Sequence, residues 1–248
     1  MKVLFFMYGL FIGSFLNVCA YRIPESKSVI YPHSSCVSCG HVLNFIDMLP
    51  VVSYICYKGR CKYCKTHYSA GYPIIEFLNG SLYFLVVLKY GLSFYSVILC
   101  LLISILIVVC LIDLKYMIIP NIVNIATSSI GMLLLLYERA SIADKILGSF
   151  LGFGLFILIS LFTGAMGGGD IKLMAVIGLV FGIKGVLFIT LFSFIIGAVI
   201  SILLICLKIK NRKDKIPFGP FISLAELLYI FYGEELIIIY YNLLYLNY

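Results

Sequence analysis

Long apolar stretches, separated by short polar connections, dominate the chain. About 20 apolar residues are enough to cross the hydrocarbon core of a bilayer as a helix. Five stretches reach this length without a charged residue, and three weaker ones contain charge. Together they predict about eight transmembrane helices, over residues 3–21, 72–90, 90–112, 116–137, 146–169, 171–188, 185–207 and 216–233. The uncharged tail 236–248 is shorter, and we expect it to be interfacial or frayed.

The composition agrees with this pattern and excludes other classes of protein. Hydrophobic residues make up 63% of the 248 residues and charged residues 12%, whereas soluble domains have about 45–50% and about 25%. A soluble fold of this size could not hide so much apolar surface from water. The prediction is therefore an all-α polytopic integral membrane protein, and not a soluble enzyme, a disordered chain, a collagen or a coiled coil.

The distribution of charge predicts the orientation in the membrane. The net charge is +7, and in a membrane protein an excess of Lys and Arg is first a topology signal. Placing segment 22–71 in the cytoplasm puts thirteen of the 18 basic residues on that side. We therefore expect membrane lipids rather than nucleic acid as partners. Lys2 before an apolar run also fits a signal peptide, but no small-residue cleavage site follows, so we expect the first helix to be retained.

The chain contains one extended polar segment, residues 22–71, which divides it into three parts. Residues 1–21 form the predicted first transmembrane helix, 22–71 a small cytosolic domain, and 72–248 the membrane core. About 50 residues bury too little apolar surface to be stable by burial alone, and such segments commonly contain a disulfide or a metal ion.

Two CxxC pairs, 21 residues apart, lie within this polar segment. Four thiolates on two tight turns can hold a zinc ion tetrahedrally and leave no open position for catalysis. A disulfide pair is the alternative, which a reducing cytosol disfavours. Cys56 and the neighbouring histidines are not needed as ligands. The predicted structural zinc site, in a domain like a zinc ribbon, consists of Cys36, Cys39, Cys61 and Cys64.

Two aspartates at the ends of predicted spans are the candidate catalytic residues. Asp113 follows a long uncharged run, and Asp170 closes the sequence Gly167-Gly168-Gly169-Asp170. In the predicted topology both lie at the cytoplasmic membrane edge, where a carboxylate is costly and is functional by default. The glycines would interrupt the helix, which is tolerated at membrane depth only beside protein or a wet cavity.

Each aspartate also has a structural explanation when taken alone. Asp113 could be a charge at a helix end, paired with Lys115, and Asp170 could be the N-cap of a helix beginning at Ile171. Taken together, two neighbouring carboxylates share a proton, so that one acts as a base and the other as an acid on an amide. That arrangement is the requirement of an aspartic protease.

The chain resembles the prepilin peptidases (type IV leader peptidases), membrane aspartic proteases of the GxGD class. The resemblance covers nearly the whole chain. Two departures are Asn121, where an Asp is common, and Met48, which interrupts the usual Asp-Asn pair. The matching positions are Gly13–Val18, Arg22, Pro24, the two CxxC pairs, Asp47, Pro50, Gly59–Cys61, Tyr72, Pro73, Glu76, Asp113, Ile119, Pro120, Gly167, Gly169, Asp170, Lys172, Leu173 and Pro217–Pro220.

The resemblance implies two activities. The first is cleavage of the basic leader of type IV prepilins and pilin-like subunits, at the cytoplasmic face of the cell inner or cytoplasmic membrane, with Asp113 and Asp170 as the catalytic pair and Gly167 and Gly169 in the active-site loop. The second is N-methylation of the new N-terminus with S-adenosylmethionine, an activity associated with the N-terminal part. No glycine-rich cofactor loop is present to locate that cofactor.

Three alternatives stay open at this point. The chain could be a peptidase without methylation. It could also be a multispan transporter, whose broken helices and acidic residues bind cations, or a zinc-containing scaffold that recruits a cytosolic partner. Pro217–Pro220 either begins a helix or forms a wall of the substrate groove. Lys115 and Lys172 either meet lipid phosphates or hold the anionic side of the site.

Overall fold

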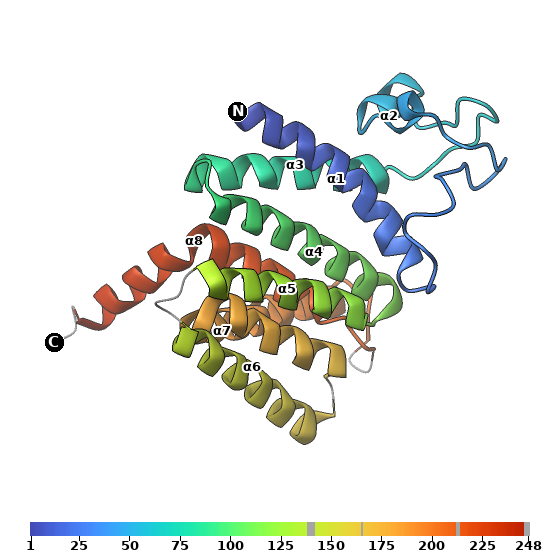
Figure 1. Ribbon diagram of the computed structural model, residues 1–248. Helices are drawn as coiled ribbons and strands as arrows, with labels where there is room; N and C mark the ends of the chain where they lie inside the picture. Colours follow the sequence, from blue (N-terminus) through green and yellow to red (C-terminus); the bar gives the residue numbers. More distant parts are fainter. Residues whose placement is uncertain (138–141, 165, 212–213, 246–248) are drawn as a thin grey trace. The chain divides into compact units, whose positions relative to one another are not determined.

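The computed structural model is built from helices and describes residues 1–137, 142–164, 166–211 and 214–245 (Figure 1). The described part of the chain contains no β-strand beyond two isolated bridges. The helices are α1 (Lys2–Arg22), η1 (Phe45–Met48), α2 (Val52–Cys56), α3 (Gly71–Tyr90), α4 (Phe94–Tyr116), α5 (Asn121–Tyr137), α6 (Ile142–Thr163), α7 (Gly168–Cys206) and α8 (Gly219–Tyr245).

Among these helices, α1, α3, α4, α6 and α7 are long and apolar enough to cross a bilayer, and α5 is apolar but shorter. The chain is therefore a helical, multi-pass membrane protein. The predicted number of eight spans is not confirmed. The chain consists of two compact units, Met1–Val108 and Val109–Tyr248.

In the first unit, α1 and α3 pack against each other in antiparallel directions through small residues. A Cβ atom added to Gly9 would lie 2.7 Å from Gly80 Cα, and one added to Gly13 would lie 2.7 Å from Glu76 Cα. Only glycine allows two backbones to approach this closely, as is common between helices in membranes. The Asn79 side chain donates a hydrogen bond to Gly9 O at 2.7 Å, which fixes the register of the pair.

In the second unit, α7 packs against α5, α6 and α8. Glycines again allow the closest approach, because Gly148 of α6 touches the backbone of Gly178, and Gly152 touches that of Met174. These pairs show that α6 and the first half of α7 run antiparallel. Between α7 and α8, Gly197 faces Phe221 and Gly185 faces Tyr229, so that the second half of α7 runs antiparallel to α8.

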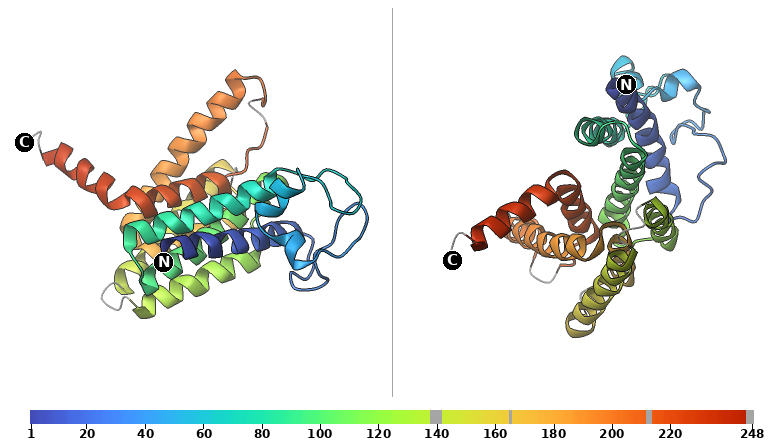
Figure 2. Two further views of the ribbon diagram at one scale, coloured as in Figure 1. Left: turned by 90° about the horizontal axis from the view of Figure 1, so that it is seen from above. Right: turned by 60° about the vertical axis from the view of Figure 1, so that its left-hand side comes forward.

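Helix α7 replaces two of the predicted spans, 171–188 and 185–207. Its 39 residues would measure about 58 Å if straight, about twice the hydrocarbon thickness. Gly182 interrupts it with φ 69° and ψ −166°, a conformation that a residue with a side chain rarely adopts. The chain therefore changes direction at Gly182 without a polar loop. Figure 2 shows that the C-terminal ends of α7 and α8 point in different directions. Helix α8 continues into the tail as far as Tyr245.

Candidate active site

Asp113 lies in the last turn of α4 and is 5% exposed. Its Oδ2 accepts a hydrogen bond of 2.7 Å from the backbone N–H of Gly219, the first residue of α8. A helix N-terminus offers unpaired N–H groups and the positive end of the helix dipole, both of which suit a carboxylate. The carboxylate of Asp113 is thus held by a residue 106 positions further along the chain.

Asp170 lies in the first turn of α7, which begins at Gly168. The predicted alternative placed it at the N-cap of a helix beginning at Ile171, whereas Gly167 is the N-cap and Asp170 is the third helical residue. Its Oδ2 accepts a hydrogen bond of 3.2 Å from Gly167 N–H. Its Oδ1 is buried and has no hydrogen-bond partner among the described residues.

The glycines before Asp170 have different surroundings. A Cβ atom on Gly169 would lie 2.9 Å from Ile119 Cβ and 3.2 Å from Ile119 O, in the connection before α5. A Cβ atom on Gly168 would meet nothing within 4 Å. Gly169 therefore permits a close approach between the start of α7 and the chain before Pro120, whereas the middle position of the motif faces open space.

The two carboxylates belong to one site within the second unit. Both are buried, at 5% and 8% exposure, and Ile119, six residues after Asp113, contacts Gly169, which directly precedes Asp170. Two carboxylates in such a place cannot both ionise readily and therefore share a proton. The second unit thus contains both buried aspartates, and a pair of neighbouring carboxylates has the chemistry of a general base and a general acid.

Two of the predicted neighbours have defined contacts. The Lys172 ammonium donates a hydrogen bond of 2.9 Å to Asn121 Oδ1. Lys115 lies over the ring of Tyr116 at 4.9 Å. Phe218 belongs to an aromatic cluster with Phe156, Phe194 and Phe221.

Sequence reasoning missed Gly219 as a functional group. Pro217–Pro220 was predicted to begin a helix or to line a groove, and the helix does begin there. The added finding is the N–H of Gly219 on Asp113. A Cβ atom at this position would lie 2.8 Å from Asp113 Oδ2, so any larger residue here would displace the carboxylate. The available signal was a glycine between two prolines at a helix start.

The four predicted cysteine ligands lie together in the first unit. The Sγ atoms of Cys36, Cys39, Cys61 and Cys64 all lie within 4.8 Å of one another. Cys36 Sγ and Cys64 Sγ are 3.8 Å apart. A tetrahedral site with Zn–S bonds of about 2.3 Å requires S···S separations of about 3.8 Å, so the geometry suits zinc.

Each CxxC pair forms the same small turn. One turn is closed by a bridge between Ser35 and Val42, and the other by a bridge between Arg60 and His67. Gly40 and Lys65 occupy equivalent positions after the second cysteine, and both have positive φ, 69° and 62°.

The other candidates for metal binding lie outside the cluster. His33, His41 and His67 are exposed, and none of them belongs to the group of four thiols. His67 Nε2 accepts a hydrogen bond of 2.9 Å from Arg60 Nε, and the His41 ring stacks on Tyr63. Cys56 is exposed and also lies outside the group.

Comparison with known proteins gives the same division of the chain. Residues 7–90 match the bacterial Peptidase A24 N-terminal domain, and residues 100–202 match the Type IV leader peptidase family. The first match contains the four cysteines and the second contains Asp113 and Asp170. No solved structure matches this chain.

Several curated proteins match nearly the full length, and each bears the name prepilin leader peptidase/N-methyltransferase. The protein of Bacillus subtilis is 33% identical over 97% of this chain and 98% of its own. The protein of Aeromonas salmonicida is 29% identical over 94% and 91%, and that of Pseudomonas aeruginosa is 28% identical over 93% and 90%. At this identity and coverage, the chain belongs to the type IV leader peptidase family.

Proposed function

We propose that this chain is a membrane aspartic endopeptidase that removes the leader of type IV prepilins and pilin-like subunits and then N-methylates the new N-terminus. The observation that supports the peptidase assignment is the burial of both Asp113 and Asp170 in the second unit, where Ile119 links the end of α4 to the start of α7 through Gly169. Relatives that bear the name of this double activity match nearly the whole chain, and a transporter is not favoured.

In the proposed reaction, the aspartate pair carries one proton and holds a water molecule. The ionised carboxylate takes a proton from the water, whose oxygen bonds to the scissile carbonyl carbon, while the protonated carboxyl gives its proton to the carbonyl oxygen. In the second step the C–N bond breaks and the amine nitrogen receives the proton that the base had taken. One hydroxyl of the tetrahedral intermediate returns its proton to the other carboxylate, which re-forms the carbonyl group and restores the singly protonated pair. Backbone N–H groups of Gly219 and Gly167 orient the two carboxylates for these transfers.

S-adenosylmethionine is the methyl donor that we propose for the second activity. Bound near the new N-terminus, it would supply an electrophilic methyl group. The cavity beside the cysteine cluster does not suit its positively charged sulfonium, because four basic side chains line it. We assign no residue to this cofactor.

Zinc is the metal that we propose for the four cysteines, in a structural role. The spacing of the four thiols supports it. A closed set of four thiolates offers no position for substrate, so the metal would stabilise the fold of residues 22–71.

The orientation follows from the basic residues. We propose that the chain resides in the cytoplasmic membrane with Asp113 and Asp170 towards the cytoplasm. In that orientation Lys115 and Lys172, beside the aspartates, and the cluster 208–215 lie on the positive side, as the positive-inside rule requires.

The peptidase assignment is tested by exchanging each aspartate for its amide. Asp113→Asn and Asp170→Asn should each lower the rate of prepilin cleavage by roughly 10²–10⁴-fold, because an amide cannot transfer the proton. The matched control is Asp214→Asn, since Asp214 is an exposed residue of the connection before α8. A gel-shift assay of prepilin processing measures the rates. Near-normal cleavage by either amide variant would exclude the aspartate pair.

Mass spectrometry of a co-expressed prepilin distinguishes the double activity from a peptidase alone. The expected product lacks the leader and carries one N-methyl group. A product that is cleaved but never methylated, although S-adenosylmethionine is available, would restrict the function to cleavage.

A further inference from the structure

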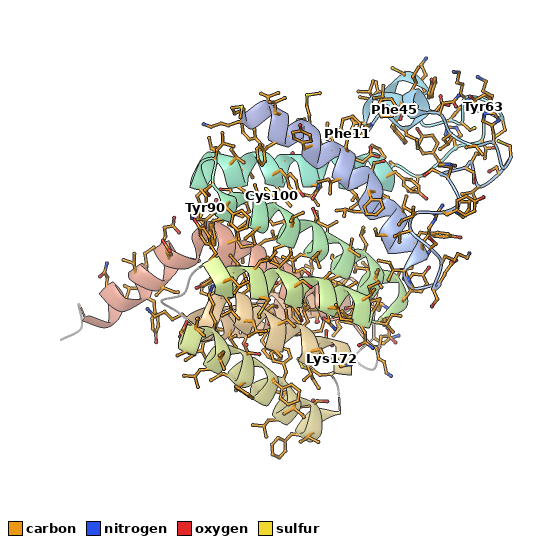
Figure 3. All side chains as sticks on the ribbon, viewed as in Figure 1. Phe11, Phe45, Tyr63, Tyr90, Cys100 and Lys172 are labelled. Atoms are coloured by element: carbon orange, nitrogen blue, oxygen red, sulfur yellow. The ribbon has the colours of Figure 1, made fainter. Side chains whose placement is uncertain are left out.

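Part of the polar segment 22–71 lies beside the apolar middle of α1. The rings of Phe11 and Phe45 stack with centroids 6.3 Å apart, and Figure 3 shows these two residues next to each other. Phe11 lies eleven residues before the end of α1 at Arg22, which is roughly 16 Å along a helix. Phe45 is therefore about 10 Å or more from the end of α1, and insertion of α1 across a bilayer would put this level inside the hydrocarbon core.

A second contact holds the same segment at the same level. The Val51 N–H donates a hydrogen bond of 2.7 Å to Glu76 Oε2, and Glu76 packs against Gly13 of α1. Gly13 lies nine residues before Arg22, roughly 13 Å along the helix. Val51 has φ 61°, a costly conformation for a β-branched residue. The Glu76 contact compensates this cost and holds the chain between η1 and α2 against α1 and α3.

The segment Phe45–Cys56, here called the interfacial segment, has its polar groups inward and its apolar groups outward. The Asp47 side chain is only 4% exposed and accepts hydrogen bonds from the hydroxyls of Tyr57 and Tyr63. In contrast, the large apolar side chains of the segment are exposed. These are Phe45, Ile46, Val52 and Ile55, at 69%, 65%, 53% and 68%. In water this arrangement would be unfavourable, whereas an interfacial helix in a bilayer has it.

A basic cavity directly follows the interfacial segment in the chain. It has a volume of about 490 Å³, and its cationic side chains are Lys58, Arg60, Lys62 and Lys65. Lys62 has a carboxylate partner, Asp47 at 3.8 Å, and the described part of the chain gives the other three none. Three uncompensated cations around one cavity suit a phosphate group.

We infer that the interfacial segment and the basic cavity form one docking surface for an anionic phospholipid leaflet. The apolar side chains enter the acyl region and the cavity binds headgroup phosphate. Continuity with the lipid-facing side of α1, through Phe11, and the charge of the cavity both indicate lipid as the occupant. The inference rests on the insertion of α1 and α3 in the membrane and is independent of the peptidase chemistry.

The chain contains no tryptophan, so single tryptophans report the depth of this surface. Ile46→Trp and Ile55→Trp are introduced separately into the full chain in phosphatidylglycerol vesicles with brominated acyl chains. Both should be quenched several-fold more strongly by these lipids than the control Val37→Trp, whose position is 95% exposed in the first cysteine turn. Acrylamide in the water should quench the control more strongly.

Two results would overturn the inference. If the reporters at 46 and 55 respond to acrylamide like the control and not to brominated lipid, the segment lies in water. If neither quencher reduces the fluorescence at positions 46 and 55, protein covers the segment, for example a second copy of the chain or the substrate. Zinc content and prepilin cleavage show whether each variant is folded, so a failure of the peptidase assignment is seen separately.

The basic cavity is tested by lipid retention in native mass spectrometry. A triple variant that combines Lys58→Gln, Arg60→Gln and Lys65→Gln should retain phosphatidylglycerol at least about tenfold less. Each cation near an anionic surface contributes about fivefold to the binding affinity. The matched control combines Lys2→Gln, Lys27→Gln and Lys89→Gln, which removes the same charge elsewhere in the first unit. Equal losses in both variants, or full displacement of lipid by inorganic phosphate, would contradict the lipid site.

Discussion

At the scale of single residues, the site depends on backbone groups as much as on the two carboxylates. Gly219 and Gly167 donate their N–H groups to Asp113 and Asp170. Gly169 has no side chain that could take part, but the absence of a Cβ atom allows the start of α7 to contact Ile119. The two carboxylates are therefore positioned by glycines, which a search for reactive side chains does not find.

The motif Gly167-Gly168-Gly169 provides a matched pair of variants. Gly169→Ala should lower cleavage roughly tenfold to a hundredfold, because its Cβ would collide with Ile119 and move Asp170. Gly168→Ala should leave the rate close to that of the wild type, since its Cβ meets nothing within 4 Å. Initial rates of prepilin cleavage measure both. Equal effects of the two variants would show that the contact with Ile119 is unimportant.

The contact between the Gly219 backbone and the Asp113 carboxylate can be tested by substituting Gly219. Gly219→Ala should lower kcat for cleavage with little change in KM, because the Cβ atom would displace the Asp113 carboxylate and not the substrate. Gly154→Ala is the control, as this glycine of α6 has open space around its Cβ position. If Gly219→Ala changes only KM, the motif acts on substrate binding instead.

At the scale of elements, the two cysteine turns are the part of the first unit that has little other support. They contain few backbone hydrogen bonds and two isolated bridges, so a metal would contribute much of their folding free energy.

The purified protein should therefore contain one zinc ion per chain. Replacing Cys36, Cys39, Cys61 or Cys64 by Ser should lower the zinc content and make residues 25–70 sensitive to proteases. Cys56→Ser should change neither, because Cys56 lies outside the cluster. Elemental analysis and limited proteolysis measure both effects. A protease-resistant domain without metal would refute the zinc assignment.

At the scale of the whole molecule, the two proposed activities map onto different parts of the chain. The aspartates lie in the second unit and the cysteine cluster in the first. The family matches divide at nearly the same place, at residues 7–90 and 100–202. We expect the peptidase to depend on the second unit and methylation to depend on the first.

Asp170→Asn should therefore still methylate a pre-cleaved pilin with a free N-terminal residue. A Cys61→Ser variant should lose more methyl transfer than cleavage, because the metal supports the first unit only. Transfer of a radiolabelled methyl group and the gel-shift assay measure the two activities on the same preparations. If a folded Asp170→Asn protein cannot methylate pre-cleaved pilin, the two activities share one site.

The local pattern of the sequence determined the helical membrane character, the grouping of four cysteines, and the two aspartates as candidates. Each of these depends on spacing or hydropathy within a short stretch, which the chain carries whatever its tertiary fold. The bounds of the helices could not be derived from the sequence alone. Gly182 joins two predicted spans into the single bent helix α7, and α6 packs against this bend through Gly148.

Only the tertiary structure decided which distant groups meet. Asp113 and Gly219 lie 106 residues apart, and Val51 and Glu76 lie 25 apart. No periodicity links such pairs, because their contacts arise when separate helices pack together. The stacking of Phe45 on Phe11 is of the same kind. Hydropathy assigned the segment around Phe45 to the polar part of the chain, whereas helix packing places it beside the apolar middle of α1.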